Sequence, residues 1–576
     1  MKKNVAYCIV CMMMLTSILS VGSIANKNLV NTNPKNILNY EDESWPMFHH
    51  NPQLTGFTSG EALDTNNQIW SVDLGEDIRF SSPAVVDNFL YIGTGEMFGT
   101  KQDEYIENYI NNIGVLSILN HKFPKSKINR EVSEFTSNGT LYCLNALNGQ
   151  HIWNIKTSGN VYSCPVVSQG NVYAVSSDMF SFEGELYCID AISGNINWNI
   201  SVMTGYATPL VTDGKLYLAM IEPDDYFGEL VCLDASTGEL LWNQTLGYVD
   251  FSLYTSPAIS ENNLLITSVE VDDEFNAFCT MKCFNATTGE MSWNTRLGSM
   301  DFGYALSSPV IEGDIAYVIN AETLDPDFWC ELNCLDISNG SILWNYTMKA
   351  ELDELSFASP AVGYGNVYFT SIGDEWAYGK IYCLDGESGE LLWTVKSSDA
   401  YTLSSPVIAE NKVYVGGFDM MLFKGQVLCY DAFDGELLFS SWASEEFIES
   451  TPAIAYGAVY IATIYGKVCA YRDIYEIGKI SGGFARVKAE IINVGDIDIE
   501  NVDCAMTVSG GMFGLINRTL GDTITLLKAN SSETISISPV LGFGPIEINV
   551  QIRASTISSC IEKKNGFVFG PLIFVY

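Results

Sequence analysis

The clearest copy of the repeat that specifies the fold is Gly379-Lys-Ile-Tyr-Cys383-Leu-Asp385-Gly-Glu-Ser-Gly389-Glu-Leu-Leu-Trp393, followed by Ser405-Pro406-Val and Lys412-Val-Tyr-Val415. The same pattern occurs eight times, at intervals of roughly 44–51 residues outside one insertion. Each copy contains four short runs of β-branched, aromatic and aliphatic residues bounded by Gly and Asn, which is the pattern of short β-strands. A repeat of this length with four strands is typical of a β-propeller blade. The sequence therefore predicts an all-β protein whose main domain is an eight-bladed β-propeller.

Two positions mark every copy. The first is a large aromatic residue after the hairpin between the third and fourth strands, and we expect it to pack against the neighbouring blade. This blade-docking position is held by Trp70, Trp153, Trp198, Trp242, Trp293, Trp344 and Trp393, with Phe439 as the eighth. The second is a pair that begins the first strand, namely Ser82-Pro83, Cys164-Pro165, Thr208-Pro209, Ser256-Pro257, Ser308-Pro309, Ser359-Pro360, Ser405-Pro406 and Thr451-Pro452.

The hairpin between the third and fourth strands reads Asp234-Ala-Ser-Thr-Gly238 in its clearest form. The Asp side chain accepts hydrogen bonds from turn amides, and Gly supplies a positive φ.

The two ends of the repeat region complement each other. The last copy ends with a third strand, Lys467-Val-Cys-Ala-Tyr-Arg-Asp473, and no tryptophan strand follows it. An unpartnered tryptophan strand, Gln68-Ile-Trp70-Ser-Val, precedes the first copy. Pairing these strands completes the eighth blade and removes the open edges. We therefore predict a propeller closed by its N-terminal strand.

The N-terminus has the composition of a secretory signal. Met1-Lys-Lys is followed by an apolar run to Val21 and by small residues up to Ala25. Residues 1–25 are predicted to be a signal peptide, although the alternative of a retained N-terminal anchor remains. Residues 26–43 are predicted to be a linker, and the mature chain is expected outside the cytoplasmic membrane with no transmembrane span.

The chain is strongly acidic, with 29 Lys and Arg residues against 69 Asp and Glu residues. Such a surface repels phosphate backbones, so nucleic acid is excluded as the expected partner. A solvated acidic surface explains the composition, and calcium binding by acidic loops is the alternative.

Eight cysteines share one position of the repeat, one blade apart, and are expected to be buried thiols. The possible disulfide is Cys504–Cys560 in the last domain.

The repeat Leu230-Val-Cys-Leu-Asp234-Ala-Ser-Thr-Gly238-Glu-Leu-Leu-Trp242 resembles the pyrroloquinoline quinone (PQQ)-type repeat. That repeat occurs in quinoprotein alcohol dehydrogenases and in the propeller lipoprotein of the outer-membrane β-barrel assembly machinery. The lead-in Trp45-Pro-Met-Phe-His-His-Asn-Pro-Gln-Leu-Thr-Gly56 is similar to that of exported, non-enzymatic members. The resemblance spans residues 44–473 and implies a propeller, but it does not specify an activity.

The adjacent His49 and His50 lie in this lead-in, with no third ligand near them in sequence for a zinc site. We expect them to pack under the ring.

One end of the propeller carries the variable loops, including an insertion at residues 96–138, and is the expected binding face. An aromatic residue precedes each first strand on this face: Phe80, Tyr162, Tyr206, Tyr254, Tyr304, Phe357, Tyr401 and Phe447. These aromatics have two interpretations: they pack between neighbouring blades, or they form a ring that contacts a ligand. Acidic loops supply the weak calcium candidates Asp224, Asp225, Asp272, Asp273, Asp325 and Asp327, for which a solvated rim is the alternative.

Enzyme activity is not expected. The resemblance implies that a quinoprotein dehydrogenase would carry calcium ligands, a catalytic Asp and a Cys-Cys disulfide over the quinone, and the sequence contains no Cys-Cys dipeptide. No catalytic or cofactor-binding residue is assigned, and PQQ is not expected.

After Asp473 the repeat stops, and several short alternating strands follow. Residues 474–576 are predicted to form an immunoglobulin-like β-sandwich, ending in a strand at 566–576 for which a docking peptide is the alternative.

The sequence as a whole predicts an exported, non-catalytic binding or scaffolding propeller at a prokaryotic cell surface, with a protein or glycan partner. The alternatives are a PQQ- and calcium-dependent oxidoreductase and an envelope protein assembly factor.

Overall fold

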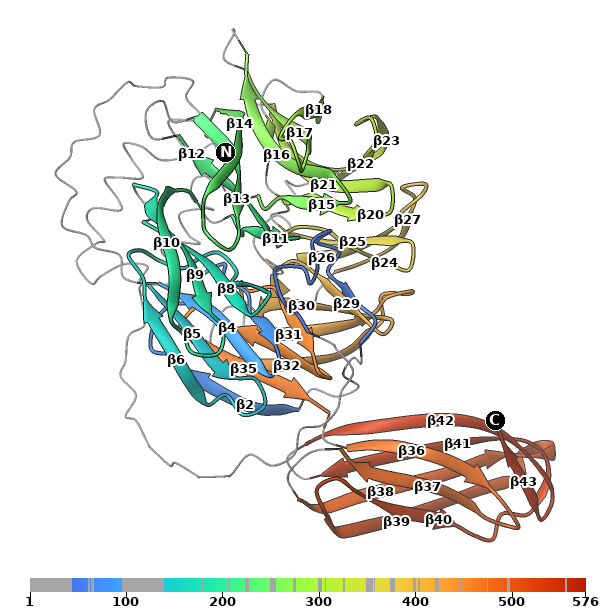
Figure 1. Ribbon diagram of the computed structural model, residues 1–576. Coiled ribbons are helices and arrows are strands. Elements are labelled where there is room, and N and C mark those ends of the chain that lie inside the picture. The colour runs from blue at the N-terminus through green and yellow to red at the C-terminus, as the bar shows by residue number, and fades with distance from the viewer. Residues whose placement is uncertain are drawn as a thin grey trace.

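The computed structural model describes residues 44–95 and 139–576, apart from short gaps. The gaps are 61–62, 64–66, 179–180, 206, 223–226, 249–254, 273–275, 299–302, 306, 325–326, 349–355, 357, 373–378, 397–399, 402–403, 420–423, 445–447, 474, 495–497 and 555–556. The predicted signal peptide, linker and 96–138 insertion therefore lie outside the described residues. The protein is almost entirely β-structure (Figure 1). In the described part of the chain, no helix is long and apolar enough to cross a membrane.

The repeats fold into antiparallel sheets that succeed one another along the chain (Figure 1). The first four sheets are β3 (Ala84–Val86), β4 (Phe89–Thr94), β5 (Thr140–Asn145) and β6 (His151–Lys156); β7 (Val166–Ser168), β8 (Asn171–Ser177), β9 (Glu183–Asp190) and β10 (Ile196–Met203); β11 (Leu210–Thr212), β12 (Lys215–Ile221), β13 (Phe227–Asp234) and β14 (Leu240–Tyr248); and β15 (Ala258–Ser260), β16 (Asn263–Val271), β17 (Ala277–Asn285) and β18 (Met291–Arg296).

Three further sheets follow the same plan with small additions. They are β20 (Val310–Glu312), β21 (Ile315–Leu324), β22 (Asp327–Asp336) and β23 (Ile342–Met348), extended by β19 (Gly303–Ala305); β24 (Ala361–Gly363), β25 (Asn366–Ile372), β26 (Gly379–Asp385) and β27 (Leu391–Lys396); and β29 (Val407–Ala409), β30 (Lys412–Asp419), β31 (Lys424–Asp431) and β32 (Leu437–Ser444), extended by β1 (Phe57–Thr58) and β28 (Ala400–Tyr401).

The remaining propeller sheet joins the two ends of the repeat region. It contains β33 (Ala453–Ala455), β34 (Ala458–Ala462), β35 (Lys467–Arg472) and β2 (Gln68–Asp73). β2 pairs antiparallel with β35, with Trp70 opposite Ala470. The N-terminal tryptophan strand therefore occupies the edge that the last repeat leaves unpaired.

Seven of the eight propeller sheets are tied to the next sheet by a tryptophan. The indole of Trp344 donates a hydrogen bond to the carbonyl of Gly386 in the next sheet (3.1 Å). Gly389, in the same hairpin, has a φ of 73°, and a Cβ added there would lie 2.7 Å from the Trp344 ring. The repeat therefore needs glycine here for two reasons: the positive φ of the turn and the close approach of the neighbouring tryptophan. The other six tryptophans of this position also donate to a backbone carbonyl of the following sheet.

The Ser/Thr-Pro pairs form a second set of links. The backbone N–H of Ser256 donates to the Oγ of Ser308 (2.9 Å), and the N–H of Ser308 donates to the Oγ of Ser359 (3.0 Å). Equivalent bonds join the other neighbouring sheets that can be traced, including one from Thr451 N–H to Ser82 Oγ (2.9 Å) between the last and first repeats. At Cys164 the sulfur accepts the bond from the N–H of Ser82 (3.2 Å). We call this set the hydroxyl ring.

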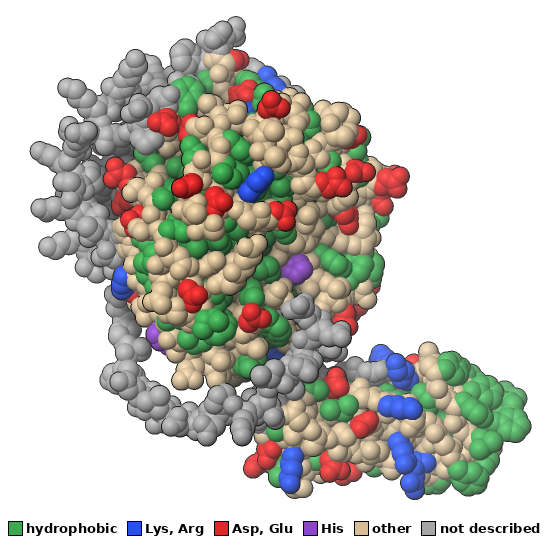
Figure 2. Space-filling view, viewed as in Figure 1, with side chains coloured by type: hydrophobic (Ala, Val, Ile, Leu, Met, Phe, Trp, Pro, Cys, Tyr) green, Lys and Arg blue, Asp and Glu red, His purple; other side chains and the backbone are tan. Residues whose placement is uncertain are grey.

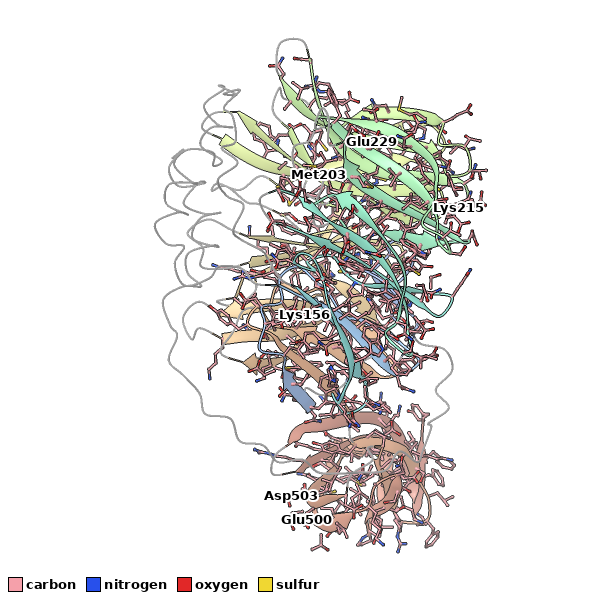
Figure 3. All side chains as sticks on the ribbon, turned by 60° about the vertical axis from the view of Figure 1, so that its left-hand side comes forward. Lys156, Met203, Lys215, Glu229, Glu500 and Asp503 are labelled. Carbon is pink, nitrogen blue, oxygen red and sulfur yellow. The ribbon has the colours of Figure 1, made fainter. Side chains whose placement is uncertain are left out.

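The two ends of the propeller differ. We call the end with the second-to-third and fourth-to-first connections the loop face, and the opposite end the hairpin face. Met203 ends β10 on the loop face, whereas Lys215 begins β12 on the hairpin face, and Figure 3 shows them on opposite sides of the propeller. Most gaps in the described chain fall in loop-face connections.

The C-terminal domain consists of two sheets. One contains β36 (Tyr475–Gly482), β37 (Val487–Asn493) and β40 (Ser531–Ile537), and the other, in spatial order, contains β39 (Ile516–Leu527), β38 (Ile499–Gly510), β41 (Gly542–Ala554), β42 (Ile557–Gly570) and β43 (Leu572–Val575). Alternate residues such as Val487, Met506 and Ile548 are fully buried, which gives this domain its own apolar core.

The predicted Cys504–Cys560 disulfide is wrong. Cys504 is a free, buried thiol. Its partner across the ladder is Ile552 of β41, and Ile552 in turn pairs with Cys560 of β42. An intervening strand separates the two cysteines by about 9–10 Å, which exceeds the Cα separation of a disulfide.

Candidate functional site

The lead-in, residues 44–58, runs along the first strands of successive sheets around the centre of the propeller. Trp45 exchanges two backbone hydrogen bonds of 2.7 Å with Val85 of β3. Its following carbonyls accept N–H bonds from Val167, Ile259, Ile311, Val362 and Ile408, which lie on the first strands β7, β15, β20, β24 and β29. β1, at the end of the lead-in, continues as a parallel partner of β29.

The position of these bonds shows which end of the propeller the lead-in covers. Each of the six bonded residues lies three positions after the Ser or Cys of the hydroxyl ring, on a first strand that runs from the loop face to the hairpin face. The lead-in is therefore about 10 Å closer to the hairpin face than the hydroxyl ring is. Trp45, Met47 and Leu54 are almost fully buried there. The hairpin-face end of the centre is therefore filled by this segment.

His49 and His50 help to hold the lead-in. His49 is fully buried, and its Nδ1 donates a hydrogen bond to the carbonyl of Leu54 (3.0 Å). Burial lowers the pKa of His49 to about 4, although that hydrogen bond raises it. Burial also lowers the pKa of His50. Both imidazoles therefore act as neutral packing groups, in agreement with the expectation that they pack under the ring.

At the loop-face end, a buried ion pair joins the first and last repeats. Arg79, before β3, donates from Nη1 to Oε1 of Glu449, before β33 (3.1 Å). The two side chains are only 3% and 10% exposed. Burial raises the pKa of Glu449, and the nearby Arg79 partly opposes this rise. Nε of Arg79 and Oε2 of Glu449 make no hydrogen bond within the described residues.

Two predicted binding-face aromatics lie beside this pair, and they differ. Phe80 is 49% exposed and has a φ of 58°, a conformation that bulky side chains rarely adopt. Tyr162 is 1% exposed and meets the Phe80 ring edge to face at 6.4 Å. Tyr162 is therefore a packing residue, because neighbouring side chains cover its ring, and Phe80 presents an aromatic surface to solvent.

The other predicted face residues are only partly described. The backbones of Tyr304 and Tyr401 lie in β19 and β28, but their side chains are outside the described residues, as are Tyr206, Tyr254, Phe357 and Phe447. Among the calcium candidates, Asp272 is described: its carboxylate accepts hydrogen bonds from the backbone N–H and the side-chain amide of Asn276. The backbone of Asp327 lies in β22, and Asp224, Asp225, Asp273 and Asp325 are outside the described residues.

Comparisons with known proteins agree with this architecture. A family model of PQQ-like repeats, described as outer membrane protein assembly factor BamB, matches residues 61–199, 182–378, 331–422 and 377–474. The chain belongs to this PQQ-like repeat family. No curated protein matches the sequence.

Similar solved structures of this family and of other propellers are distant in sequence. Quinohemoprotein alcohol dehydrogenase from Comamonas testosteroni is 12% identical, with a TM-score of 0.52 over 74% of this chain and 80% of that chain. BamB from Moraxella catarrhalis is 14% identical, with a TM-score of 0.46 over 71% of this chain and 97% of that chain. Saccharomyces cerevisiae Sqt1 is 12% identical, with a TM-score of 0.46 over 71% and 99%. At these identities the likeness concerns the fold alone.

PQQ-like repeats raise the question of whether this member fits a calcium-bound quinone. Within the described residues, no three His, Cys, Asp or Glu side chains converge in a way that would hold a metal ion. The described charged side chains at the loop-face end of the centre include Arg79 and Glu449, which form an ion pair with each other. We derive no chemical step through this cofactor.

Several residues of the site were not identified from sequence. Arg79 stands three residues before the start of the Ser82-Pro83 pair, whereas Glu449 stands two residues before the start of Thr451-Pro452. The departure of these two positions from the uncharged residues found in the other copies is the one signal that could have singled them out. The hydroxyl ring was visible in the sequence, since every copy has a hydroxyl or thiol residue before its proline. The sequence does not show that this side chain accepts a hydrogen bond from the backbone N–H of a neighbouring sheet, because that contact depends on how the sheets pack.

Proposed function

We propose that this protein is an exported, non-catalytic propeller that binds a protein or glycan partner on its loop face at the cell surface. In this proposal the sheets form an eight-bladed ring closed by β2, and an immunoglobulin-like sandwich follows. Support for closure comes from the β2–β35 pairing, from the Thr451–Ser82 hydrogen bond and from the Arg79–Glu449 pair, each of which joins the first and last repeats. Support for the sandwich comes from its two sheets, β36-β37-β40 and β39-β38-β41-β42-β43.

The observation that carries the binding proposal is the course of the lead-in. This segment makes backbone hydrogen bonds to six first strands on the hairpin-face side of the hydroxyl ring. A partner that reaches the centre must therefore come from the loop face. Propellers combine a rigid ring with variable connections at one end, which is an arrangement suited to recognition.

Phe80 is the described side chain that best fits such a role. Its ring is half exposed, and its left-handed backbone is held between the Arg79–Glu449 pair and the hydroxyl ring. A strained aromatic presented on a rigid base is a reasonable ligand contact, because aromatic faces stack on sugars and on apolar side chains.

The test uses the full mature chain and a matched pair of variants. Phe80→Ala removes the loop-face aromatic, and Phe433→Ala removes a ring of similar exposure (55%) from a hairpin. Immobilised wild-type protein is screened against a glycan array and against envelope proteins by cross-linking. We expect a partner whose binding falls at least about tenfold with Phe80→Ala and is unchanged with Phe433→Ala. Binding that depends on Phe433 and not on Phe80 would contradict the loop-face assignment.

The family match favours an envelope protein assembly factor as a second candidate, because the matching model is described by that role. This candidate predicts that the loop-face partner is another component of envelope assembly. Identification of the cross-linked partner by mass spectrometry separates it from surface recognition of glycans.

A quinoprotein oxidoreductase is the rival from another class. Its test is direct: protein incubated with PQQ and calcium would show bound-quinone absorbance and dye-linked alcohol oxidation. Our proposal expects neither signal.

A further inference from the structure

The end of the sandwich away from the propeller carries an unusual concentration of exposed apolar side chains (Figure 2). Each of these side chains is between 46% and 87% exposed: Phe484, Met512, Phe513, Leu515, Leu541, Phe543, Phe569, Leu572, Phe574 and Tyr576. We call this set the apolar cap. Soluble proteins rarely expose so many large apolar groups together unless the surface has a partner.

The cap is built from four separate chain connections that meet at one end of the domain. They are the β36–β37 turn, the β38–β39 connection with its short 3-10 turn Met512–Gly514, the β40–β41 connection and the β42–β43 turn. β36 runs from the propeller side toward this end, so the cap is the distal end of the sandwich. The aromatic side chains therefore converge from loops far apart in sequence.

The backbone of the cap is held by its own hydrogen bonds. The N–H of Val540 donates to the carbonyl of Ala485 (3.0 Å), and the N–H of Ile573 donates to the carbonyl of Gly483 (3.0 Å). A further bond joins Gly511 N–H to the carbonyl of Pro545 (2.6 Å). Because these bonds tie the connections to one another, the apolar side chains are directed outward from a fixed base.

Charge is unevenly distributed within the same domain. The strand segments next to the cap are residues 480–490, 507–519, 534–549 and 563–576, and their acidic residues are Glu490 and Glu547. The same segments contain five exposed cations: Arg486, Lys488, Arg518, Lys563 and Lys564. The other eight acidic residues of 474–576 lie outside these segments, as Glu500 and Asp503 do in the first half of β38 (Figure 3). An excess of cations near the cap is notable in a chain with 69 acidic residues.

We propose that the apolar cap docks on a lipid bilayer with anionic headgroups. Apolar side chains at the end of a domain, with Lys and Arg behind them, match the depth profile of such a membrane: acyl chains take the apolar groups and headgroups pair with the cations. A second copy of this surface is a poorer occupant, because it would bring ten cations together. The proposal is independent of the loop-face function, since it concerns the other domain.

The experiment measures binding of the full mature chain to vesicles by co-sedimentation. One set of vesicles contains zwitterionic lipid alone. In the other set, about a third of the lipids carry an anionic headgroup. Phe513→Ser/Leu515→Ser removes two cap side chains that are 87% and 82% exposed, so the fold is not expected to change. The matched control is Ile192→Ser/Phe433→Ser, which removes two exposed apolar side chains (72% and 55%) from propeller hairpins.

We expect the wild type and the hairpin control to bind anionic vesicles equally and the cap variant to bind at least about tenfold more weakly. Lys563→Gln/Lys564→Gln should weaken binding to anionic vesicles roughly tenfold and should leave the weaker zwitterionic binding unchanged. Failure of the wild type to bind either vesicle would overturn the proposal. Equal binding by the cap variant and the wild type would overturn it too. A wild-type dimer in solution that Phe513→Ser/Leu515→Ser dissociates, without vesicle binding, would assign the cap to self-association instead.

Discussion

Acidification should loosen the lead-in, because His49 is buried in its neutral form. The Nδ1–H of His49 bonds to Leu54, and its buried Nε2 has no hydrogen-bond partner within the described residues. A proton on Nε2 would place an unpaired charge in this site. Burial therefore lowers the folded-state pKa from 6.5 to about 4. The stability linked to this group is fully present above pH 6.5 and is lost as the pH falls toward 4.

The magnitude follows from that difference in pKa. One pKa unit corresponds to about 1.4 kcal/mol, so the shift implies a loss of about 3 kcal/mol by pH 4, of which about 2 kcal/mol is lost by pH 5. His50 acts in the same direction, since burial also lowers its pKa. A loss of about 2 kcal/mol corresponds to a roughly 30-fold fall in the protection of the lead-in amides.

The assay is amide hydrogen exchange by mass spectrometry on the peptide covering residues 47–57, at pH 7.5 and pH 5.0, after correction for intrinsic exchange rates. We expect the fall in protection in the wild type and in His151→Gln, a control at an exposed histidine of β6. His49→Gln keeps a hydrogen-bond donor without the titration, and should lose most of the pH dependence. Protection that does not change with pH in the wild type, or that falls equally in His49→Gln, would show that His49 does not cause the loss of stability.

Two other predictions concern the packing of the sheets. Gly389→Ala and Gly365→Ala both place a Cβ at a φ near 75°, but only the first brings it against Trp344 (2.7 Å), whereas the second meets nothing within 4 Å. Urea unfolding should therefore show Gly389→Ala to be less stable than Gly365→Ala by roughly 1–3 kcal/mol, and equal effects would contradict the proposed contact. Arg79→Ala leaves Glu449 buried and unpaired, so the free energy of unfolding should fall by about 3–5 kcal/mol at neutral pH. This penalty should shrink as the pH is lowered, because protonation removes the charge of Glu449, whose pKa is already raised. The double variant Arg79→Met/Glu449→Leu should recover most of the lost stability. If it does not, the loss is not caused by an unpaired buried charge.

Local sequence was sufficient to predict the strands and turns. The hairpin Asp234–Gly238 has the expected geometry: the Asp234 carboxylate accepts the N–H groups of Ser236 and Thr237, and Gly238 has a φ of 74°. The early tryptophan strand does pair with Lys467–Arg472. These features were accessible because turn chemistry and alternation act over a few residues, and because eight copies of the pattern reinforce one another.

The candidate site was much less accessible from sequence. Phe80 and Tyr162 occupy the same position of the repeat, yet one is half exposed and the other is buried. The sequence placed Cys504 and Cys560 in one small domain, but the register of β41 separates them. Burial and register of this kind depend on neighbours that are distant along the chain.

The repeat pattern and its turn chemistry predict that this chain forms four-stranded repeats, where each repeat begins, and which residues turn the chain. Three features follow only from how the sheets pack: the lead-in covers the hairpin-face centre, Arg79 meets Glu449 across 370 positions of sequence, and four connections of the C-terminal domain share one apolar end. The difference lies in the range of the interactions along the chain. Turn geometry and strand alternation are set by adjacent residues, whereas these contacts exist only after the sheets have packed and brought distant segments within hydrogen-bonding distance.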